Sequence, residues 1–135
     1  MSPKLIVLVE DDVNLRHSIV LILQRAGYLV NATDCVYKAL DLLRSGTYQL
    51  VISDINIPET ANVLIPKVLD SYPQVSIVIL TDQSTHESEK GGKLLSAHYL
   101  VKPIAPERLL DSVGLLLGRI HQSNQQGNSS NGQLN

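Results

Sequence analysis

Apolar residues along the chain gather into five short runs, at residues 4–9, 28–33, 49–53, 75–80 and 98–101. The first, third and fourth runs are almost continuously apolar and rich in Val and Ile. That composition is typical of strands covered on both faces. We therefore expect five β-strands, with these three buried most completely.

Segments with helical spacing lie between and after these runs. Apolar residues recur every three or four positions in residues 15–26, 39–43, 63–69 and 109–120. Gly27 and Gly46 stand where the first two helices should end, Pro73 follows the third, and Pro106 suits the first turn of the last. A further segment, "STHESEKGGKLLSA" (84–97), contains Gly91-Gly92, which costs a helix about 2 kcal/mol relative to two alanines. We expect only a short or mobile helix there.

Strand and helix patterns alternate along the chain, which favours a parallel sheet with helices on both faces. Right-handed crossovers then favour a doubly wound α/β fold. In such sheets the functional groups gather at the carboxyl ends of the strands.

The length of 135 residues, with 44% hydrophobic and 18% charged residues, suits one globular domain. We place that domain at residues 1–121. From residue 122 the sequence "QSNQQGNSSNGQLN" is almost purely polar, so residues 122–135 are expected to be a disordered tail or a truncated linker.

The overall charge, the length of the apolar runs and the cysteine and histidine positions argue against several kinds of partner, location and metal site. A net charge of -2 gives no electrostatic reason to expect a nucleic acid or an acidic membrane as partner. No apolar run approaches the roughly 20 residues that span a bilayer. Cys35 is alone, which favours a reducing, cytoplasmic location. The histidines lack metal-ligand spacing and are interpreted as surface or packing residues: His17, His86, His98 and His121.

Acidic residues follow two of the buried strands. Glu10, Asp11 and Asp12 come directly after the first strand, and Asp54 ends the third. Asp12 suits the N-cap of the following helix. If the first and third strands are neighbours, the other three carboxylates converge at one edge of the sheet.

Converging carboxylates need a compensating cation or a functional reason. Two carboxylates about 5 Å apart repel by roughly 3 kcal/mol at an effective dielectric of 20, whereas a helix cap contributes about 1 kcal/mol. Oxygen ligands without Cys or His favour Mg²⁺, which is commonly held together with a substrate phosphate. Lys102, after the fifth strand, can supply a further positive charge, and the hydroxyl of Thr81 can donate to a phosphoryl oxygen.

Four motifs of the chain, taken together, resemble those of a known protein family. "LVEDD", "VISDINIP", "ILTD" and "YLVKP", in this order and spacing, resemble the receiver domain of two-component response regulators over residues 4 to about 120. The resemblance implies a flavodoxin-like, five-stranded parallel sheet. The strand order 2-1-3-4-5 is a known property of this family and is carried over with the resemblance.

The resemblance also implies roles for the acids. Asp54 matches the aspartate that accepts a phosphoryl group from the phosphohistidine of a sensor histidine kinase or phosphotransfer protein. Asp11 and Asp54 match direct Mg²⁺ ligands, and the backbone carbonyl of Asn56 matches a third. Glu10 matches the acid that acts through a water molecule.

The remaining matches concern charge compensation and signalling. Lys102 matches the lysine that neutralises the transferring group, and Thr81 with Tyr99 matches the switch pair. The face formed by the fourth helix, fifth strand and fifth helix would then bind an output domain, a partner protein or a second copy of the chain. The resemblance implies no turnover enzyme, only Mg²⁺-dependent self-phosphorylation and weak autodephosphorylation.

The chain departs from the family pattern at three places. Asp82 follows the switch threonine where a small residue is usual, so Asp82 and its neighbour Gln83 are candidate modulators. Asn62 stands where a glycine commonly makes a turn, a conformation that asparagine tolerates. The Gly91-Gly92 pair weakens the helix expected to transmit the signal.

Two alternatives to a phosphorylation switch remain. The chain could be a degenerate receiver that binds partners without phosphorylation, for which Asp82 is the main argument. It could also be a phosphohydrolase on a similar sheet. Such enzymes typically use a second aspartate two residues after the nucleophile, and Asn56 occupies that position.

Overall fold

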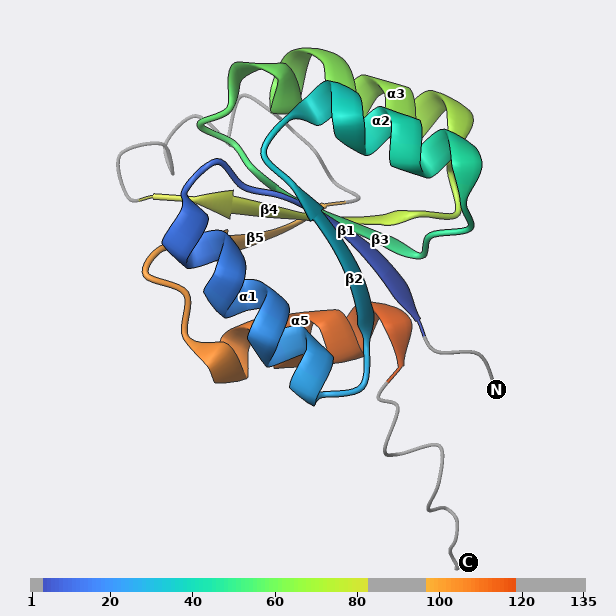
Figure 1. Ribbon diagram of the computed structural model, residues 1–135. Helices are drawn as coiled ribbons and strands as arrows, with labels where there is room; N and C mark the ends of the chain where they lie inside the picture. Colours follow the sequence, from blue (N-terminus) through green and yellow to red (C-terminus); the bar gives the residue numbers. More distant parts are fainter. Residues whose placement is uncertain (1–3, 83–96, 119–135) are drawn as a thin grey trace, which may run out of the picture.

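The computed structural model describes residues 4–82 and 97–118. Within them, a parallel sheet has the order β2-β1-β3-β4-β5 (Figure 1). The strands are β1 Leu5–Val9, β2 Leu29–Thr33, β3 Leu50–Asp54, β4 Ser76–Thr81 and β5 Ala97–Val101. The predicted fold class and strand order are confirmed, and the strand ends differ from the apolar runs by only a residue or so.

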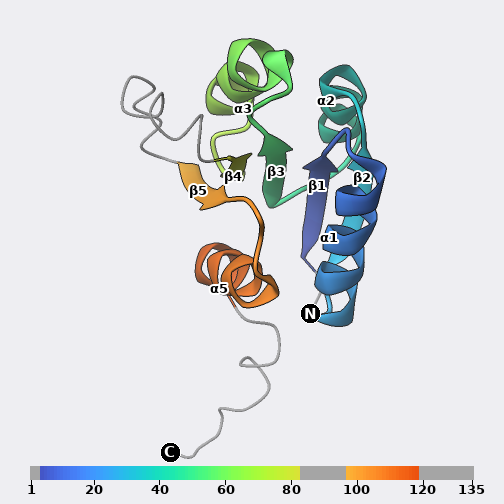
Figure 2. The same cartoon turned by 90° about the vertical axis from the view of Figure 1, so that its left-hand side faces the viewer.

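Helices cover both faces of the sheet (Figure 2). They are α1 Val13–Arg25, α2 Val36–Ser45, α3 Ile65–Ser71 and α5 Pro106–Leu117. Helices α1 and α5 lie on one face, and α2 and α3 lie on the other (Figure 1). No helix in these two stretches of chain is both long enough and apolar enough to cross a membrane.

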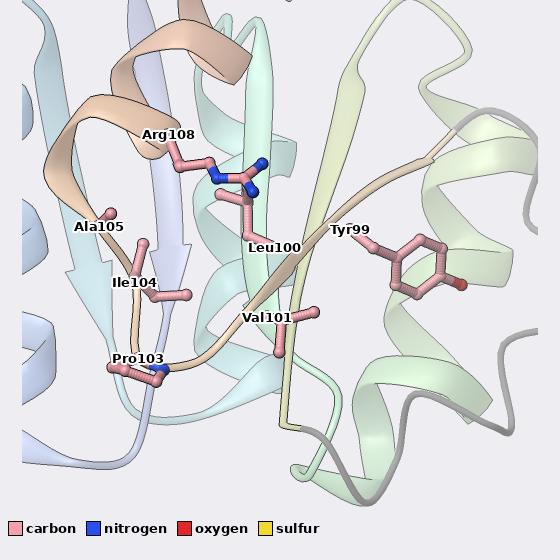
Figure 3. A pocket seen from close by; sticks show the side chains of 7 residues that line it. All are labelled: Tyr99, Leu100, Val101, Pro103, Ile104, Ala105 and Arg108. Carbon is pink, nitrogen blue, oxygen red and sulfur yellow. The ribbon is translucent and has the colours of Figure 1, made fainter.

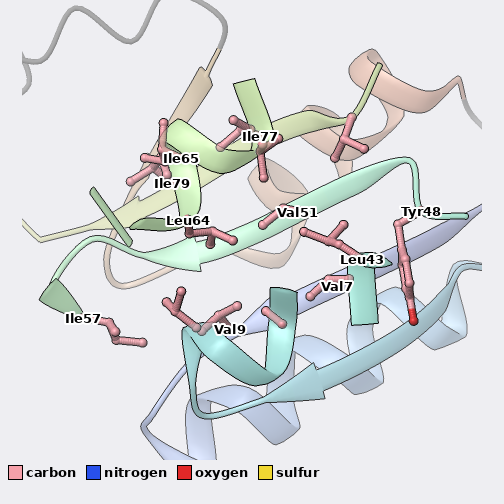
Figure 4. Close-up of a cluster of buried hydrophobic side chains, with 14 residues drawn as sticks. Val7, Val9, Leu43, Tyr48, Val51, Ile57, Leu64, Ile65, Ile77 and Ile79 are labelled. Atoms are coloured by element: carbon pink, nitrogen blue, oxygen red, sulfur yellow. The ribbon is translucent and has the colours of Figure 1, made fainter. Parts of the chain in front are cut away.

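Successive side chains of each strand point to opposite faces of the sheet, and this divides the core into two layers. In β1, Ile6 and Leu8 belong to the cluster beneath α1 and α5, whereas Val7 and Val9 belong to the cluster beneath α2 and α3 (Figure 4). The same two-residue period applies to β3 and β4. It decides which face of the sheet each residue near a strand end occupies.

Local chemistry explains several helix ends. The Asp12 carboxylate accepts a hydrogen bond from the Leu15 amide at 3.0 Å, so the predicted N-cap is confirmed. Gly27 follows α1 with a φ of 100°, a conformation that favours glycine. Gly46 is the C-cap of α2, and Pro106 is the first residue of α5, as predicted.

The start of the third helical segment differs from the prediction. A π-helical turn, η1 Thr60–Leu64, leads directly into α3. Asn62 therefore lies inside a wide helical turn, not in the left-handed turn suggested by the family's glycine. The predicted helix at 84–97 lies outside the described residues except for Ala97, which begins β5. Gln83, the end of the last predicted helix and residues 122–135 also lie outside them.

Candidate functional site at the carboxyl edge of the sheet

Three carboxylates meet where β1 and β3 end. Val9 pairs with Ser53, so Glu10, directly after β1, lies beside Asp54, the last residue of β3. One oxygen each of Glu10, Asp11 and Asp54 lies within 4.8 Å of the others. Glu10 is 0% exposed and Asp54 is 2% exposed, whereas Asp11 faces solvent. The predicted convergence of these acids is observed.

Lys102 supplies the positive charge of this cluster. Its Nζ lies 2.6 Å from Asp54 Oδ2 and 3.6 Å from Glu10 Oε1. The Lys102 amide donates to the Thr81 carbonyl at 2.7 Å, which fixes the backbone where β5 leaves the sheet. Burial opposes the charge of Lys102, but the hydrogen bond to Asp54 and the charge of Glu10 outweigh it and raise the lysine pKa.

Glu10 is a buried acid whose negative charge is only partly compensated by its surroundings. Its Oε2 accepts from the Asp12 amide at 3.0 Å, whereas its Oε1 is buried with no hydrogen-bond donor. Burial raises the pKa of Glu10 to about 7; the Asp12 amide and Lys102 oppose the rise, and the Asp54 charge adds to it. An ionised Glu10 is therefore costly here unless another cation is present.

The donor set suits a hard cation. All the side-chain groups that could hold an ion here are carboxylates, and the buried Glu10 Oε1 accepts no hydrogen bond, although Lys102 Nζ lies 3.6 Å away. Hard ions such as Mg²⁺ prefer oxygen ligands and commonly use one or two carboxylates. The three acids are thus compatible with a bound metal ion.

Asp54 is fixed by the loop that follows it. Its Oδ1 accepts from the Asn56 amide at 2.8 Å. Its backbone carbonyl accepts from the Ile57 amide at 3.1 Å and from the Thr60 hydroxyl at 2.8 Å. The exposed Asn56 side chain donates to Asp82 Oδ2 at 3.2 Å, which brings the candidate modulator Asp82 to the rim of the site.

Thr81 and Tyr99 lie on the β4–β5 side of the same edge. Thr81 is 2% exposed, and its hydroxyl donates to the Asp82 carbonyl at 3.2 Å. Tyr99 is half-buried and packs against the α2–α3 core. Its ring points away from the neighbouring Arg108 (Figure 3). Thr81 is therefore close to the strand end that carries Asp54, whereas Tyr99 lies farther back along β5.

A pocket of about 240 Å³ lies between β5 and the start of α5 (Figure 3). Its lining is formed by Tyr99, Leu100, Val101, Pro103, Ile104, Ala105 and Arg108. Val101, one of these lining residues, is 37% exposed, so the pocket has an accessible apolar side chain. The described part of the predicted partner face therefore offers both apolar and polar groups, including the Arg108 side chain.

Sequence reasoning missed three residues that hold the acids in place. Arg16 Nη1 donates to the Glu10 carbonyl at 2.7 Å. Ser53 and Thr60 form a buried hydroxyl pair beneath Asp54. The spacing of Arg16, one helical turn after the Asp12 cap, could have indicated a contact with the preceding loop. Nothing in the local pattern pointed to Ser53 or Thr60.

Comparison with known proteins identifies relatives of this chain. The response regulator receiver domain family matches residues 6–114. Response regulator protein FleR of Pseudomonas aeruginosa is 32% identical over 129 residues, which cover 90% of this chain and 26% of FleR. Transcriptional regulatory protein BasR of Escherichia coli is 31% identical, over 92% of this chain and 55% of BasR.

Solved structures show the same fold. Chemotaxis protein CheY4 of Vibrio cholerae has a TM-score of 0.73 and 28% identity, covering 86% of this chain and 100% of CheY4. The chain thus spans the whole of one relative, but about a quarter of FleR and about half of BasR.

Proposed function

Because this chain belongs to the receiver domain family of two-component response regulators, we propose that Asp54 accepts a phosphoryl group and thereby switches the domain. The supporting observation is the Lys102 ammonium 2.6 Å from Asp54 Oδ2, within a cluster of three carboxylates. Catalysis of phosphoryl transfer rests mainly on positioning and on stabilisation of charge. This edge of the sheet provides both.

The phosphoryl donor is a phosphohistidine of a sensor kinase or of a phosphotransfer protein. A carboxylate oxygen of Asp54 attacks phosphorus, a P–O bond forms, and the P–N bond to the donor imidazole breaks. The electron pair of the broken bond stays on the imidazole nitrogen. Lys102 is positioned to offset the charge of the incoming group, and the Asn56 amide orients the carboxylate at 2.8 Å.

The cation of this site is Mg²⁺ in our proposal. Asp11, Asp54 and the backbone carbonyl of Asn56 would hold it, and Glu10 would act through a water molecule. When bound, the ion neutralises part of the charge on the phosphoryl oxygens. The buried Glu10 Oε1, which has no hydrogen-bond donor, supports this assignment.

Thr81 and Tyr99 form the switch in our proposal. The Thr81 hydroxyl turns from the Asp82 carbonyl to the phosphoryl group, and the Tyr99 ring moves inward behind it. The β5–α5 face then changes its affinity for an output domain, a partner protein or a second copy of the chain. The chain acts as a phospho-acceptor in the cytoplasm, with slow self-dephosphorylation, and not as a turnover enzyme.

A degenerate receiver is the second candidate, and one observation favours it. Asn56 holds the negatively charged Asp82 side chain at the rim of the acceptor site. A like charge there opposes an incoming phosphoryl group. The phosphohydrolase alternative loses support, since Asn56 cannot act as a general acid.

Intact mass spectrometry tests the proposal. The protein is incubated with acetyl phosphate and Mg²⁺, and a single phosphoryl adduct is expected. The adduct should be absent from Asp54→Asn and from a sample treated with a chelator, and present in the control Asp70→Asn, which changes an exposed aspartate on α3. A folded parent protein without an adduct would favour the degenerate receiver instead.

A further inference from the structure

Two buried hydroxyl groups lie directly behind the acceptor strand end. Ser53 Oγ and Thr60 Oγ1 are 2.7 Å apart, and both residues are 0% exposed. Thr60 Oγ1 also lies 2.8 Å from the backbone carbonyl oxygen of Asp54. Buried polar groups are costly unless they are hydrogen-bonded, so this pair needs an explanation.

The direction of the hydrogen bonds follows from the donors available. A carbonyl oxygen can only accept, so the single hydroxyl hydrogen of Thr60 points to the Asp54 carbonyl. Thr60 Oγ1 must then accept from Ser53 Oγ. The result is a directed chain from Ser53 through Thr60 to the backbone of Asp54.

Strand alternation places this chain behind the acid cluster. Ser53 occupies the same face of β3 as Val51, which belongs to the α2–α3 core, and Asp54 takes the opposite face. Thr60 is the first residue of η1 on that side. The hydroxyl pair thus reaches the backbone of Asp54 without occupying any position around its carboxylate.

Thr60 also closes the loop that carries Asn56. Its amide donates to the Ile57 carbonyl at 2.9 Å, the Ile57 amide donates to the Asp54 carbonyl at 3.1 Å, and the Ile65 amide donates to the Thr60 carbonyl. Asn56 lies in the middle of this closed loop, with its amide on Asp54 Oδ1. The loop geometry is therefore set at Thr60.

We propose that Ser53 and Thr60 are positioning residues that set the affinity of the site for a hard divalent cation. They fix the loop so that the Asp54 carboxylate and the Asn56 carbonyl are oriented before the ion arrives. This inference rests on the proposed function and adds two residues to it. Groups that orient ligands from outside the coordination sphere commonly change metal affinity by tenfold or more.

A purely structural role predicts a different result. Replacing both partners of a buried hydrogen bond with apolar groups of similar shape can leave stability nearly unchanged. The double variant Ser53→Ala/Thr60→Val would then fold well and bind the ion like the parent. A positioning role predicts a folded double variant with weakened binding.

Calorimetric titration of the metal-free protein with MgCl₂ separates these possibilities. We expect about tenfold weaker binding for Thr60→Val and for the double variant, and about threefold for Ser53→Ala, which keeps the Thr60–Asp54 bond. Thr60→Ser retains the hydroxyl and should bind within about twofold of the parent. Ile65→Val, which removes one carbon from the same core layer, is the matched control and should bind like the parent.

Amide hydrogen exchange gives a readout that needs no metal. The Ile57 amide should exchange faster in Thr60→Val than in Ile65→Val or the parent, because its acceptor carbonyl is no longer held. If Thr60→Val folds and binds Mg²⁺ with the affinity of the parent, the inference is overturned while the proposed function stands. If Thr60→Val does not fold, parent-like Mg²⁺ affinity in Ser53→Ala has the same meaning. A parent protein that binds no Mg²⁺ would overturn both the inference and the proposed cation site.

Discussion

The two halves of the functional edge are built differently. At the β1–β3 end, Glu10 and Asp54 are almost completely buried, and charged or backbone donors hold Asp54 at 2.6 and 2.8 Å. At the β4–β5 end, three of the five residues of β5 are half-buried and one is exposed. There the Thr81 hydroxyl and the Asp82 side chain each take part in a longer contact, at 3.2 Å.

This difference matches the two tasks of a switch. An acceptor must be oriented before the reaction, which favours a rigid and desolvated environment. A responding element must have two arrangements of similar free energy, which favours fewer and weaker contacts. Substitutions at the β1–β3 end should therefore have larger effects than substitutions at the β4–β5 end.

The largest expected effect concerns the pH dependence of stability. The folded-state pKa of Glu10 is raised from 4.5 to about 7, so the unfolded chain loses this proton first. The free energy of unfolding in the absence of metal should fall between about pH 4.5 and pH 7, by up to roughly 3 kcal/mol, and then level off. Below pH 4.5 both states keep the proton, and the contribution is fully retained.

Urea unfolding in a chelating buffer at several pH values measures this effect. Glu10→Gln should remove the decline, and Mg²⁺ should restore part of the stability of the parent at pH 8. If the free energy of unfolding depends on pH in the same way in the parent and in Glu10→Gln, Glu10 is not the cause of the decline.

The next prediction compares the loss of stability on replacing a half-buried lysine with that on replacing an exposed one. Lys102→Met removes the partner of the buried Asp54, so the metal-free protein should lose about 2 kcal/mol of stability at pH 8. Lys38→Met removes an exposed ion pair with Asp34 at 3.4 Å and should change stability by less than about 0.5 kcal/mol. Equal losses in the two variants would contradict the difference between the buried edge and the surface.

The smallest effect lies at the β4–β5 end. Asp82 is half-buried, so solvent screens part of its repulsion of a phosphoryl group. Asp82→Ala should increase the rate of phosphorylation by acetyl phosphate about three- to tenfold. Asp70→Ala removes a distant exposed carboxylate and should leave the rate unchanged. The same rate in Asp82→Ala and the parent would remove Asp82 as a modulator.

The elements and the acid cluster could be predicted because they rest on short-range patterns. Apolar runs of Val and Ile mark β1, β3 and β4, and the position of Asp12 before an amphipathic segment marks a helix start. Acids at the ends of neighbouring parallel strands must meet, so the proximity of Glu10, Asp11 and Asp54 followed from topology. The strand order itself came from resemblance to the family.

The supporting contacts could not be predicted, because they depend on the path of one loop. Ser53 and Thr60 are seven positions apart, one in β3 and the other at the start of η1, and only the path of the loop between them brings their hydroxyl groups together. The contact of Asn56 with Asp82 joins residues 26 positions apart in the chain. Hydroxyl and amide side chains show no periodicity that would indicate such partners.

The most direct test of the central claim is to locate the phosphoryl group. After treatment with acetyl phosphate and Mg²⁺, borohydride reduction converts a phosphorylated aspartate to homoserine, which peptide mass spectrometry can assign to a position. We predict homoserine at position 54 and at no other acid of the edge. Homoserine at position 11, 12 or 82 with Asp54 unmodified would contradict the account.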